Sequence, residues 1–162
     1  PARGLIGFRS QFLTMTSGSG IMTHIFDHYG PVTTAVLAAR QNGVLVSMVT
    51  GKSLAYALHA LQERGRLFLD PNIQVYEGQI VGLHSRGNDL VVNPTKAKQL
   101  TNVRASGTDE ALTLSPPVKH TLEQALEFIE EDELVEVTPE SIRLRKKWLL
   151  EHERKRASRS AA

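Results

Sequence analysis

Apolar residues recur at helical spacing in some segments of the chain and alternate with polar residues in others. Residues 3–14 show roughly helical spacing and are predicted to form a helix, although two glycines weaken the pattern. Residues 16–20 are a turn cluster of Thr, Ser and Gly. Residues 21–29 alternate in part, which predicts a strand ending at Gly30-Pro31. Residues 32–42 are expected to connect two structural units.

The middle of the chain predicts a compact sheet with one helix. Residues 43–49 are a β-branched apolar run and predict a buried strand. Ser53 follows in the position of an N-cap, before a helical stripe made by Leu54, Ala57, Leu58 and Leu61. Gly65 is in the position of a left-handed C-terminal cap. Residues 66–69 are short and apolar, and residues 75–84 predict two strand segments around glycines that mark a bulge or bend.

The apolar pattern mostly fails between residues 85 and 108, where only residues 90–92 resemble a strand. Long polar stretches of this kind tend to be functional or disordered. Residues 111–114 then predict another strand, and Thr121 with Gln124 has the form of a capping box before a helix that reaches Ile129.

The last forty residues predict a hairpin followed by a helix. Residues 134–138 and 142–145 alternate, with a turn at residues 139–141. A helix that begins at Pro139 and is capped by Thr138 is the alternative. Under either interpretation we expect a terminal helix at about residues 147–156.

Composition excludes several classes of protein. The chain has 162 residues, 41% of them hydrophobic and 22% charged, which is ordinary for a globular protein. No cysteine is present, which excludes disulfides and thiolate metal sites and favours a cytoplasmic location. No stretch approaches the roughly 18 apolar residues of a membrane span, and we expect no secretory signal. Because the chain begins with Pro1, we favour a piece cut from a longer protein.

The net charge of +2 is unevenly distributed. Residues 143–162 contain eight Lys or Arg against Glu151 and Glu153, so the rest of the chain is mildly acidic. A basic tail on an acidic body is suited to phosphate contact. A solvated helix end without a ligand is the alternative.

No catalytic site is evident from the sequence. Gly51-Lys52-Ser53 lies between a predicted strand and helix, as a P-loop would, but Val46 stands where a P-loop requires glycine. We therefore expect a tight turn there, in which Lys52 is still able to meet an RNA phosphate. His24 and His28 are four residues apart, but on a strand they would not share a site as helical i and i+4 residues do, so we expect no metal site. The acidic run at residues 130–133 is interpreted as a solvated helix end.

Several segments together resemble one family. Residues 3–9 and 14–20 resemble the last helix and strand of the ferredoxin-like domain shared by elongation factor G and its relatives. Residues 76–82, 88–93, 98–110 and 121–129 resemble the C-terminal domain of the BipA/TypA translational GTPases, and so does the Thr138-to-Lys146 segment. The block Leu100-Thr-Asn-Val-Arg-Ala-Ser-Gly107 is the most specific of these.

The resemblance implies an α+β fold in two parts. Residues 1–35 would be the second half of the ferredoxin-like domain, a helix and strand without their usual cover. Residues 36–162 would be the BipA/TypA C-terminal domain. For that domain we expect a small mixed β-sheet or barrel-like body flanked by helices, with a long polar loop and a basic C-terminal helix.

The family also implies a function. It comprises GTPases that bind the ribosome and act in large-subunit assembly and stress-adapted translation. The resemblance places the binding of GTP and Mg, and the hydrolysis of GTP, in an N-terminal domain that this sequence lacks. We therefore expect no cofactor and no enzymatic activity in this chain. The polar loop is expected to approach the acceptor end of an A-site tRNA, and the basic tail to contact rRNA. The competing interpretations are a mobile loop with scattered charges, or a protein–protein adaptor that pairs, even with a second copy, through its apolar N-terminal segment.

The residues expected to contact RNA come from two regions. In the polar loop they are Arg86, Asn88, Asn93, Lys96, Lys98, Asn102 and Arg104. In the tail they are Lys146, Lys147, Arg154, Lys155 and Arg156. Cationic and amide side chains of this kind supply most contacts to phosphates and to exposed base edges.

Overall fold

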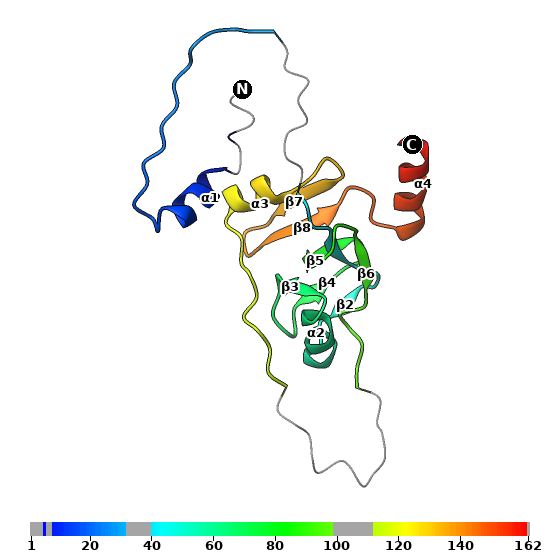
Figure 1. Ribbon diagram of the computed structural model, residues 1–162. Coiled ribbons are helices and arrows are strands. Elements are labelled where there is room, and N and C mark those ends of the chain that lie inside the picture. The colour runs from blue at the N-terminus through cyan, green and yellow to red at the C-terminus, as the bar shows by residue number, and fades with distance from the viewer. Residues whose placement is uncertain (1–4, 6–7, 32–39, 99–111, 162) are drawn as a thin grey trace.

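A computed structural model describes residue 5 and residues 8–31, 40–98 and 112–161 (Figure 1). Within these residues the chain forms a mixed sheet with helices on both faces, which confirms the predicted α+β class. No helix of the described residues is long and apolar enough to cross a membrane. The predicted connector at residues 32–42 lies mostly outside the described residues.

The N-terminal segment contains the predicted helix but not the predicted strand. Helix α1 spans Phe8–Met15. The turn after it contains Ser17 and Gly18, whose φ angles are 51° and 81°. The strand expected at residues 21–29 is wrong, because these residues have no strand conformation. Ile21 and Ile25 are 88% and 90% exposed. A strand is stable only beside a partner and over a core, and no described segment pairs with this one.

The main sheet has the order β6-β1-β5-β8-β7, with β3 also paired to β5. Its strands are β1 (Val44–Ser47), β3 (Gly65–Leu67), β5 (Gln79–His84), β6 (Leu90–Val92), β7 (Glu133–Val137) and β8 (Ile142–Lys146). Only β1 and β6 are parallel. The described strands form an open sheet, not a closed barrel.

The predicted irregularity near the glycines of β5 is confirmed. Leu45 faces Gly82 and Val46 faces Ile80, so one residue of β5 bulges between them. Gly82 is required there because a Cβ atom would come within 2.5 Å of the Arg66 carbonyl oxygen. Gly78 just before the strand has a φ of 86°, a conformation that L side chains rarely adopt.

One face of the sheet is covered by α2 (Ala55–Gln62) and a small two-stranded sheet, β2 (Gly51–Lys52) with β4 (Gln74–Val75). Two predicted caps of α2 are wrong. Leu54 is the N-cap, because the buried Ser53 hydroxyl instead donates to the Asp70 carbonyl at 2.9 Å and accepts from the Ile73 amide. Gly65 begins β3, where a Cβ atom would lie 1.9 Å from the Leu83 carbonyl oxygen.

The other face is covered by α3 (Leu122–Phe128). Its predicted capping box between Thr121 and Gln124 is present. Leu45 of β1 packs into the core on the α2 side, whereas Val44 and Val46 pack on the α3 side. This two-sided burial explains why β1 is uniformly apolar and does not alternate.

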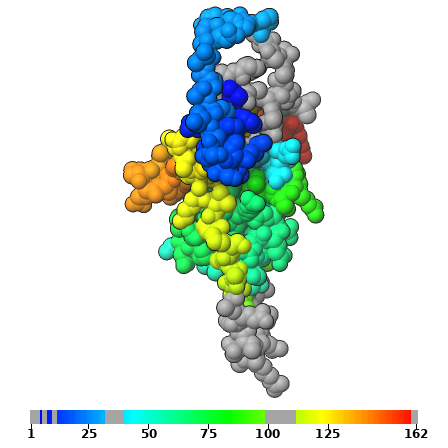
Figure 2. All heavy atoms as spheres, turned by 60° about the vertical axis from the view of Figure 1, so that its left-hand side comes forward, coloured from blue at the N-terminus to red at the C-terminus, as the bar shows by residue number. Residues whose placement is uncertain are grey.

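Residues 112–118 cross the body without forming the predicted strand (Figure 2, yellow-green). The side chain of Gln62 provides partners that a neighbouring strand would have supplied. Its amide donates to the Thr113 carbonyl, and its oxygen accepts from the Ser115 amide, both at 3.0 Å. The strand predicted at residues 111–114 is therefore wrong for the residues that the structure describes.

The C-terminal part confirms the hairpin and moves the last helix. Strands β7 and β8 pair in register from Glu133 and Lys146 to Val137 and Ile142. The turn is held by Thr138 and Ser141, so the alternative helix from Pro139 does not form. Helix α4 spans Glu151–Ala161 and begins four residues later than predicted.

A buried ion cluster joins the two ends of the hairpin to the rest of the domain. Glu133 is 2% exposed and forms a paired contact with Arg40, with distances of 2.8 and 2.9 Å. Lys146, also 2% exposed, reaches Glu133 at 2.9 Å. The Lys146 ammonium further contacts Asp89 at 2.6 Å and Asp132 at 2.8 Å. We call these five residues the ion cluster.

The cluster connects distant segments through the backbone as well. Asp89 accepts from the Val44 amide at 2.9 Å, which fixes the turn after β5 to the start of β1. Arg40 donates to the Phe128 carbonyl at 3.0 Å, and its guanidinium carbon lies 4.4 Å from the centre of the Phe128 ring. Burial alone would raise the pKa of Glu133, but its hydrogen bond from Arg40 and the charge of Lys146 outweigh burial and lower it.

The first prediction concerns the stability that the ion cluster confers. Glu133→Gln leaves Arg40 and Lys146 buried with one negative charge fewer, and the expected loss is about 3 kcal/mol of unfolding free energy. Urea unfolding followed by circular dichroism measures it. Glu131→Gln, at an exposed position of the same acidic run, is the control and should cost less than about 0.5 kcal/mol. Equal effects of the two substitutions would contradict the role of the cluster.

The second prediction follows from the lowered pKa of Glu133. A carboxyl whose pKa is lower in the native state stabilises the fold above its ordinary value, here 4.5. That contribution disappears as pH falls from 4.5 through the native pKa. The stability difference between the parent and Glu133→Gln should therefore be full at neutral pH and vanish in acid. A difference that persists unchanged below the native pKa would refute the assignment.

Candidate nucleic-acid interface

The polar loop leaves the sheet through a fixed turn. The Asn93 side-chain oxygen accepts from the amide and the hydroxyl of Thr95, both at 2.9 Å. The Pro94 carbonyl accepts from the Leu54 amide at 2.9 Å. Asn93 was expected to contact RNA, but in the structure its side-chain oxygen stabilises the turn at the base of the loop.

Beyond this turn the described loop residues are exposed. Lys96 and Lys98 are exposed, and Lys52 of β2 lies beside the same turn, because a Cβ on neighbouring Gly51 would lie 3.2 Å from Thr95. Asn102 and Arg104 lie outside the described residues. The base of the loop thus carries several cations on one side of the domain.

Arg86 and Asn88 are at the other end of β6. The backbone carbonyl of Asn88 lies 2.6 Å from Nδ1 of the His84 ring. The side-chain amide of Asn88 donates to the backbone carbonyl of Asp89 at 3.3 Å. Arg86 has an exposed side chain, while its carbonyl accepts from the Gly43 amide. The three residues of β6 span roughly 10 Å, so residues 85–98 form two separate polar sites and not one.

The prediction of Lys146 as an RNA contact is wrong. Its ammonium is enclosed by three carboxylates of the ion cluster. Burial would lower the pKa of Lys146, yet hydrogen bonds to Asp132 and Asp89 and the charge of Glu133 raise it, so it stays charged inside the protein. The alternation of β8 sends Lys146 and Leu144 inward, whereas Arg143 and Arg145 lie on the opposite face.

The remaining tail residues divide into internal and exposed groups. Arg154 donates to the carbonyls of Trp148 and Leu149, which precede α4, so it has a structural role. Lys155 pairs with Glu151 one turn away at the surface. Lys147, Arg156 and Arg159 are exposed, and within the described residues they have no carboxylate partner.

Helix α4 and the base of the polar loop lie at opposite ends of the domain in Figure 1. The exposed cations therefore make two surfaces, each able to meet a different stretch of polyanion. The term loop surface is used for Lys52, Lys96 and Lys98, and the term tail surface for Lys147, Arg156 and Arg159.

Arg40, Asp89 and Glu133 were not predicted from the sequence to be partners of a buried charge. The only signal was the pair of acidic residues, Asp132 and Glu133, at the start of a strand whose partner strand ends in Lys146. Glu130, Asp132 and Glu133 lie close enough together to suggest a cation site. Arg40 and Lys146 already supply the positive charge there.

The conformation of Gly51-Lys52-Ser53 is not that of a phosphate-binding loop. Its hydroxyl is buried between the Asp70 carbonyl and the Ile73 amide. Lys52 is in β2, paired with Gln74, so the segment is an extended strand where a P-loop would wrap around phosphates. The tight strand-to-helix turn predicted there is therefore wrong, because Gly51 and Lys52 form a short strand of their own.

Comparisons with known proteins agree with this architecture. Residues 42–151 match the family described as the TypA/BipA C-terminal domain, and residues 1–40 match the elongation factor G C-terminus. The predicted boundary between residues 35 and 36 remains a prediction.

The curated relatives are similar over almost the whole chain. A Haemophilus influenzae protein named large ribosomal subunit assembly factor BipA is 61% identical over 99% of this chain. The Escherichia coli K12 protein of the same name is also 61% identical, and that of Buchnera aphidicola is 57% identical over 98% of the chain. The chain spans 26% of the length of each of these relatives. These matches confirm the resemblance noted in the sequence: the chain belongs to the TypA/BipA family and corresponds to the C-terminal part of its members.

Proposed function

We propose that this chain is the RNA-contacting C-terminal module of a ribosome-associated translational GTPase that acts in assembly of the large ribosomal subunit. The name of the curated relatives supports the assembly role. The observation that carries RNA contact is the sorting of charge by the fold. Lys146 and Arg40 are neutralised inside, while the loop and tail surfaces present exposed cations.

The proposal assigns the two surfaces to two contacts. The loop surface, together with Asn102 and Arg104 later in the sequence, meets the acceptor end of an A-site tRNA, and Arg86 and Asn88 add a separate contact. The tail surface meets rRNA phosphates, with Lys155 released from Glu151, since exposed ion pairs of this kind contribute little to stability. Binding of GTP and Mg, and the hydrolysis of GTP, belong to the N-terminal domain of the parent protein. The parent protein works in the cytoplasm and acts in stress-adapted translation.

A protein–protein adaptor is the second candidate, favoured by one observation. Phe26 and Tyr29 are 71% and 94% exposed and lie near the exposed Ile21 and Ile25. An apolar segment this exposed is suited to cover by another protein surface. Gel filtration distinguishes this candidate, because pairing of two copies through the segment would give a dimer that Ile25→Ser and Phe26→Ser dissociate.

The third prediction tests the loop surface. Replacing Lys96, Lys98 and Arg104 with Ala should weaken ribosome binding and lower the slope of log affinity against log salt by about 2 to 3. Co-sedimentation with ribosomes across a salt series measures both. The matched control removes the exposed cations of Arg64, Arg66 and Lys119, and should leave affinity within about twofold. Unchanged affinity of the loop variant at low salt would remove the loop from the interface.

The fourth prediction separates binding from folding in the tail. Arg156→Ala with Arg159→Ala should lower the salt slope by about 1.4 to 1.8 without changing the melting temperature. Arg154→Ala should do the reverse, since it loses hydrogen bonds to two backbone carbonyls, at a cost of about 1 kcal/mol. If Arg156→Ala with Arg159→Ala lowers only the melting temperature, the tail is structural.

A further inference from the structure

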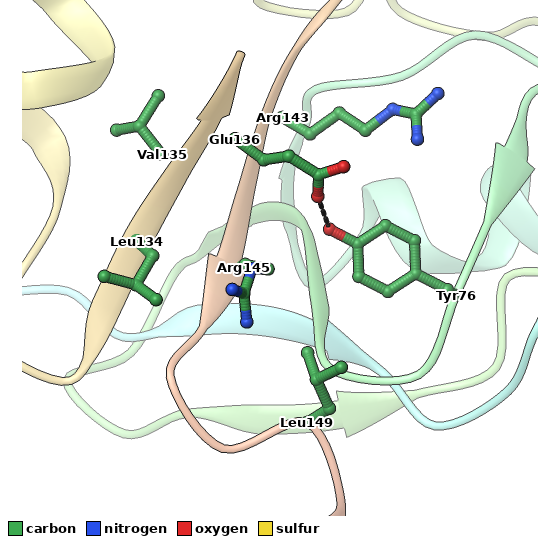
Figure 3. A pocket seen from close by; sticks show the side chains of 7 residues that line it. All are labelled: Tyr76, Leu134, Val135, Glu136, Arg143, Arg145 and Leu149. Atoms are coloured by element: carbon green, nitrogen blue, oxygen red, sulfur yellow. Dashed lines mark hydrogen bonds between the residues drawn. The ribbon is translucent and has the colours of Figure 1, made fainter. Parts of the chain in front are cut away.

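The outer face of the β7–β8 hairpin contains an open groove of about 510 Å³ that the loop and tail surfaces do not include (Figure 3). Its lining comes from three segments. Tyr76 follows β4, Leu134 and Glu136 are on β7, Arg143 and Arg145 are on β8, and Leu149 precedes α4. In Figure 2 the end of the hairpin (orange) projects from the body. The volume is in the range of about 300–1,000 Å³ that is typical of ligand sites.

The two arginines of the groove lack the ion pairs that the buried Arg40 and Lys146 form. Within the described residues neither forms an ion pair, and Arg145 donates only to the neighbouring Lys146 carbonyl, at 3.4 Å. Lys146, on the inner face of the same strand, has three carboxylate partners. Successive outward residues of a strand lie about 7 Å apart. Two outward arginines on one strand, with Glu136 as the one carboxylate among the lining residues, leave a net positive charge that fits an anionic ligand.

Glu136 is the acidic residue of the groove, and Tyr76 engages it. The register places Glu136 opposite Arg143 and Leu134 opposite Arg145. The Tyr76 hydroxyl donates to one carboxylate oxygen of Glu136, which orients the aromatic ring toward the hairpin (Figure 3). Burial and this hydrogen bond both raise the pKa of Tyr76, so the hydroxyl stays protonated as a donor. The second Glu136 oxygen has no described partner and is available to accept from a ligand.

The apolar part of the groove consists of Leu134, Leu149 and the Tyr76 ring. Gly78 is held against Leu149, since a Cβ atom there would lie 2.6 Å from the Leu149 Cα. This contact fixes the wall relative to the strands. The ligand must therefore combine a flat apolar face for this wall, anionic groups for the two arginines and a hydrogen-bond donor for the free Glu136 oxygen.

We propose that this groove holds one unpaired nucleotide of an RNA strand. The base lies against Tyr76 and Leu149 and donates its amino group to Glu136, while Arg143 and Arg145 bind the flanking phosphates. This inference deepens the proposed function, on which it rests, by adding a third contact of a different kind. An acidic peptide would satisfy the arginines, and its backbone N–H groups could bond Glu136, but its acidic side chains would offer the apolar wall no flat surface. A base paired in a helix exposes neither of its faces, so the groove selects single-stranded RNA.

The test measures fluorescence anisotropy of the full chain with a labelled mixed-sequence RNA of about ten nucleotides, single-stranded or paired in a duplex. Arg143→Gln with Arg145→Gln should weaken single-strand binding about tenfold and duplex binding less than about twofold. The control, Arg64→Gln with Arg66→Gln, removes the same charge from the exposed turn after α2 and from β3. It should change neither affinity by more than about twofold.

A second variant keeps the net charge and guards against misfolding. Arg143→Lys with Arg145→Lys preserves both charges but loses the planar guanidinium groups, and single-strand affinity should still fall about threefold. Circular dichroism melting confirms that each variant is folded. Equal losses in the groove and control variants, or equal losses for single strand and duplex, would overturn the proposal. So would tighter binding of a polyglutamate peptide than of RNA.

The same variants distinguish this inference from the proposed function. If the parent co-sediments with ribosomes and the groove variant binds single-stranded RNA as the parent does, only the groove assignment fails. If the parent does not bind ribosomes but the groove variant loses single-strand affinity, the groove stands as an RNA site and the ribosomal role fails.

Discussion

Glu133 is held between Arg40 and Lys146 with its carboxylate removed from solvent, and most of the domain is organised around this contact. Arg40 precedes the first strand, Lys146 ends the last strand, and Asp89 belongs to the turn that leads into β6. A buried charge without a partner is costly. The hairpin can therefore pack on the sheet only when the segment before β1 and the turn after β5 are both in place. The cluster couples segments that are more than a hundred residues apart in the chain.

The same constraint sorts the basic residues into two groups. Strand alternation sends Lys146 inward and its neighbours Arg143 and Arg145 outward. The carboxylates that neutralise Lys146 are engaged by it, and Glu136 is the one carboxylate among the groove residues beside the two outward arginines. Arg154 is likewise engaged by backbone carbonyls, whereas Arg156 is exposed. A positive outer surface is thus a consequence of how the interior is neutralised, and net charge alone would not reveal it.

Sequence patterns were reliable where the determining contacts are local. The capping box of Thr121 and Gln124 acts within one turn, and the hairpin of β7 and β8 closes within four residues, so both were predicted. The patterns failed where a distant partner decides. Ser53 has the local form of a cap, but Asp70 and Ile73 engage its hydroxyl, and Gly65 is a glycine because of Leu83. Residues 21–29 alternate as a strand does but lack a neighbour, and the inward direction of Lys146 depends on the register of a hairpin against Glu133.

The central claim is that the loop and tail surfaces contact RNA on the ribosome, while Lys146 inside the fold does not. Lysine acetylation followed by mass spectrometry, in the free chain and bound to ribosomes, tests it most directly. We expect Lys96 and Lys147 to react in the free chain and to be protected on the ribosome, Lys119 to react in both states, and Lys146 to react in neither. Equal reactivity of Lys96 and Lys147 with and without ribosomes, or ready acetylation of Lys146 in the folded chain, would contradict the account.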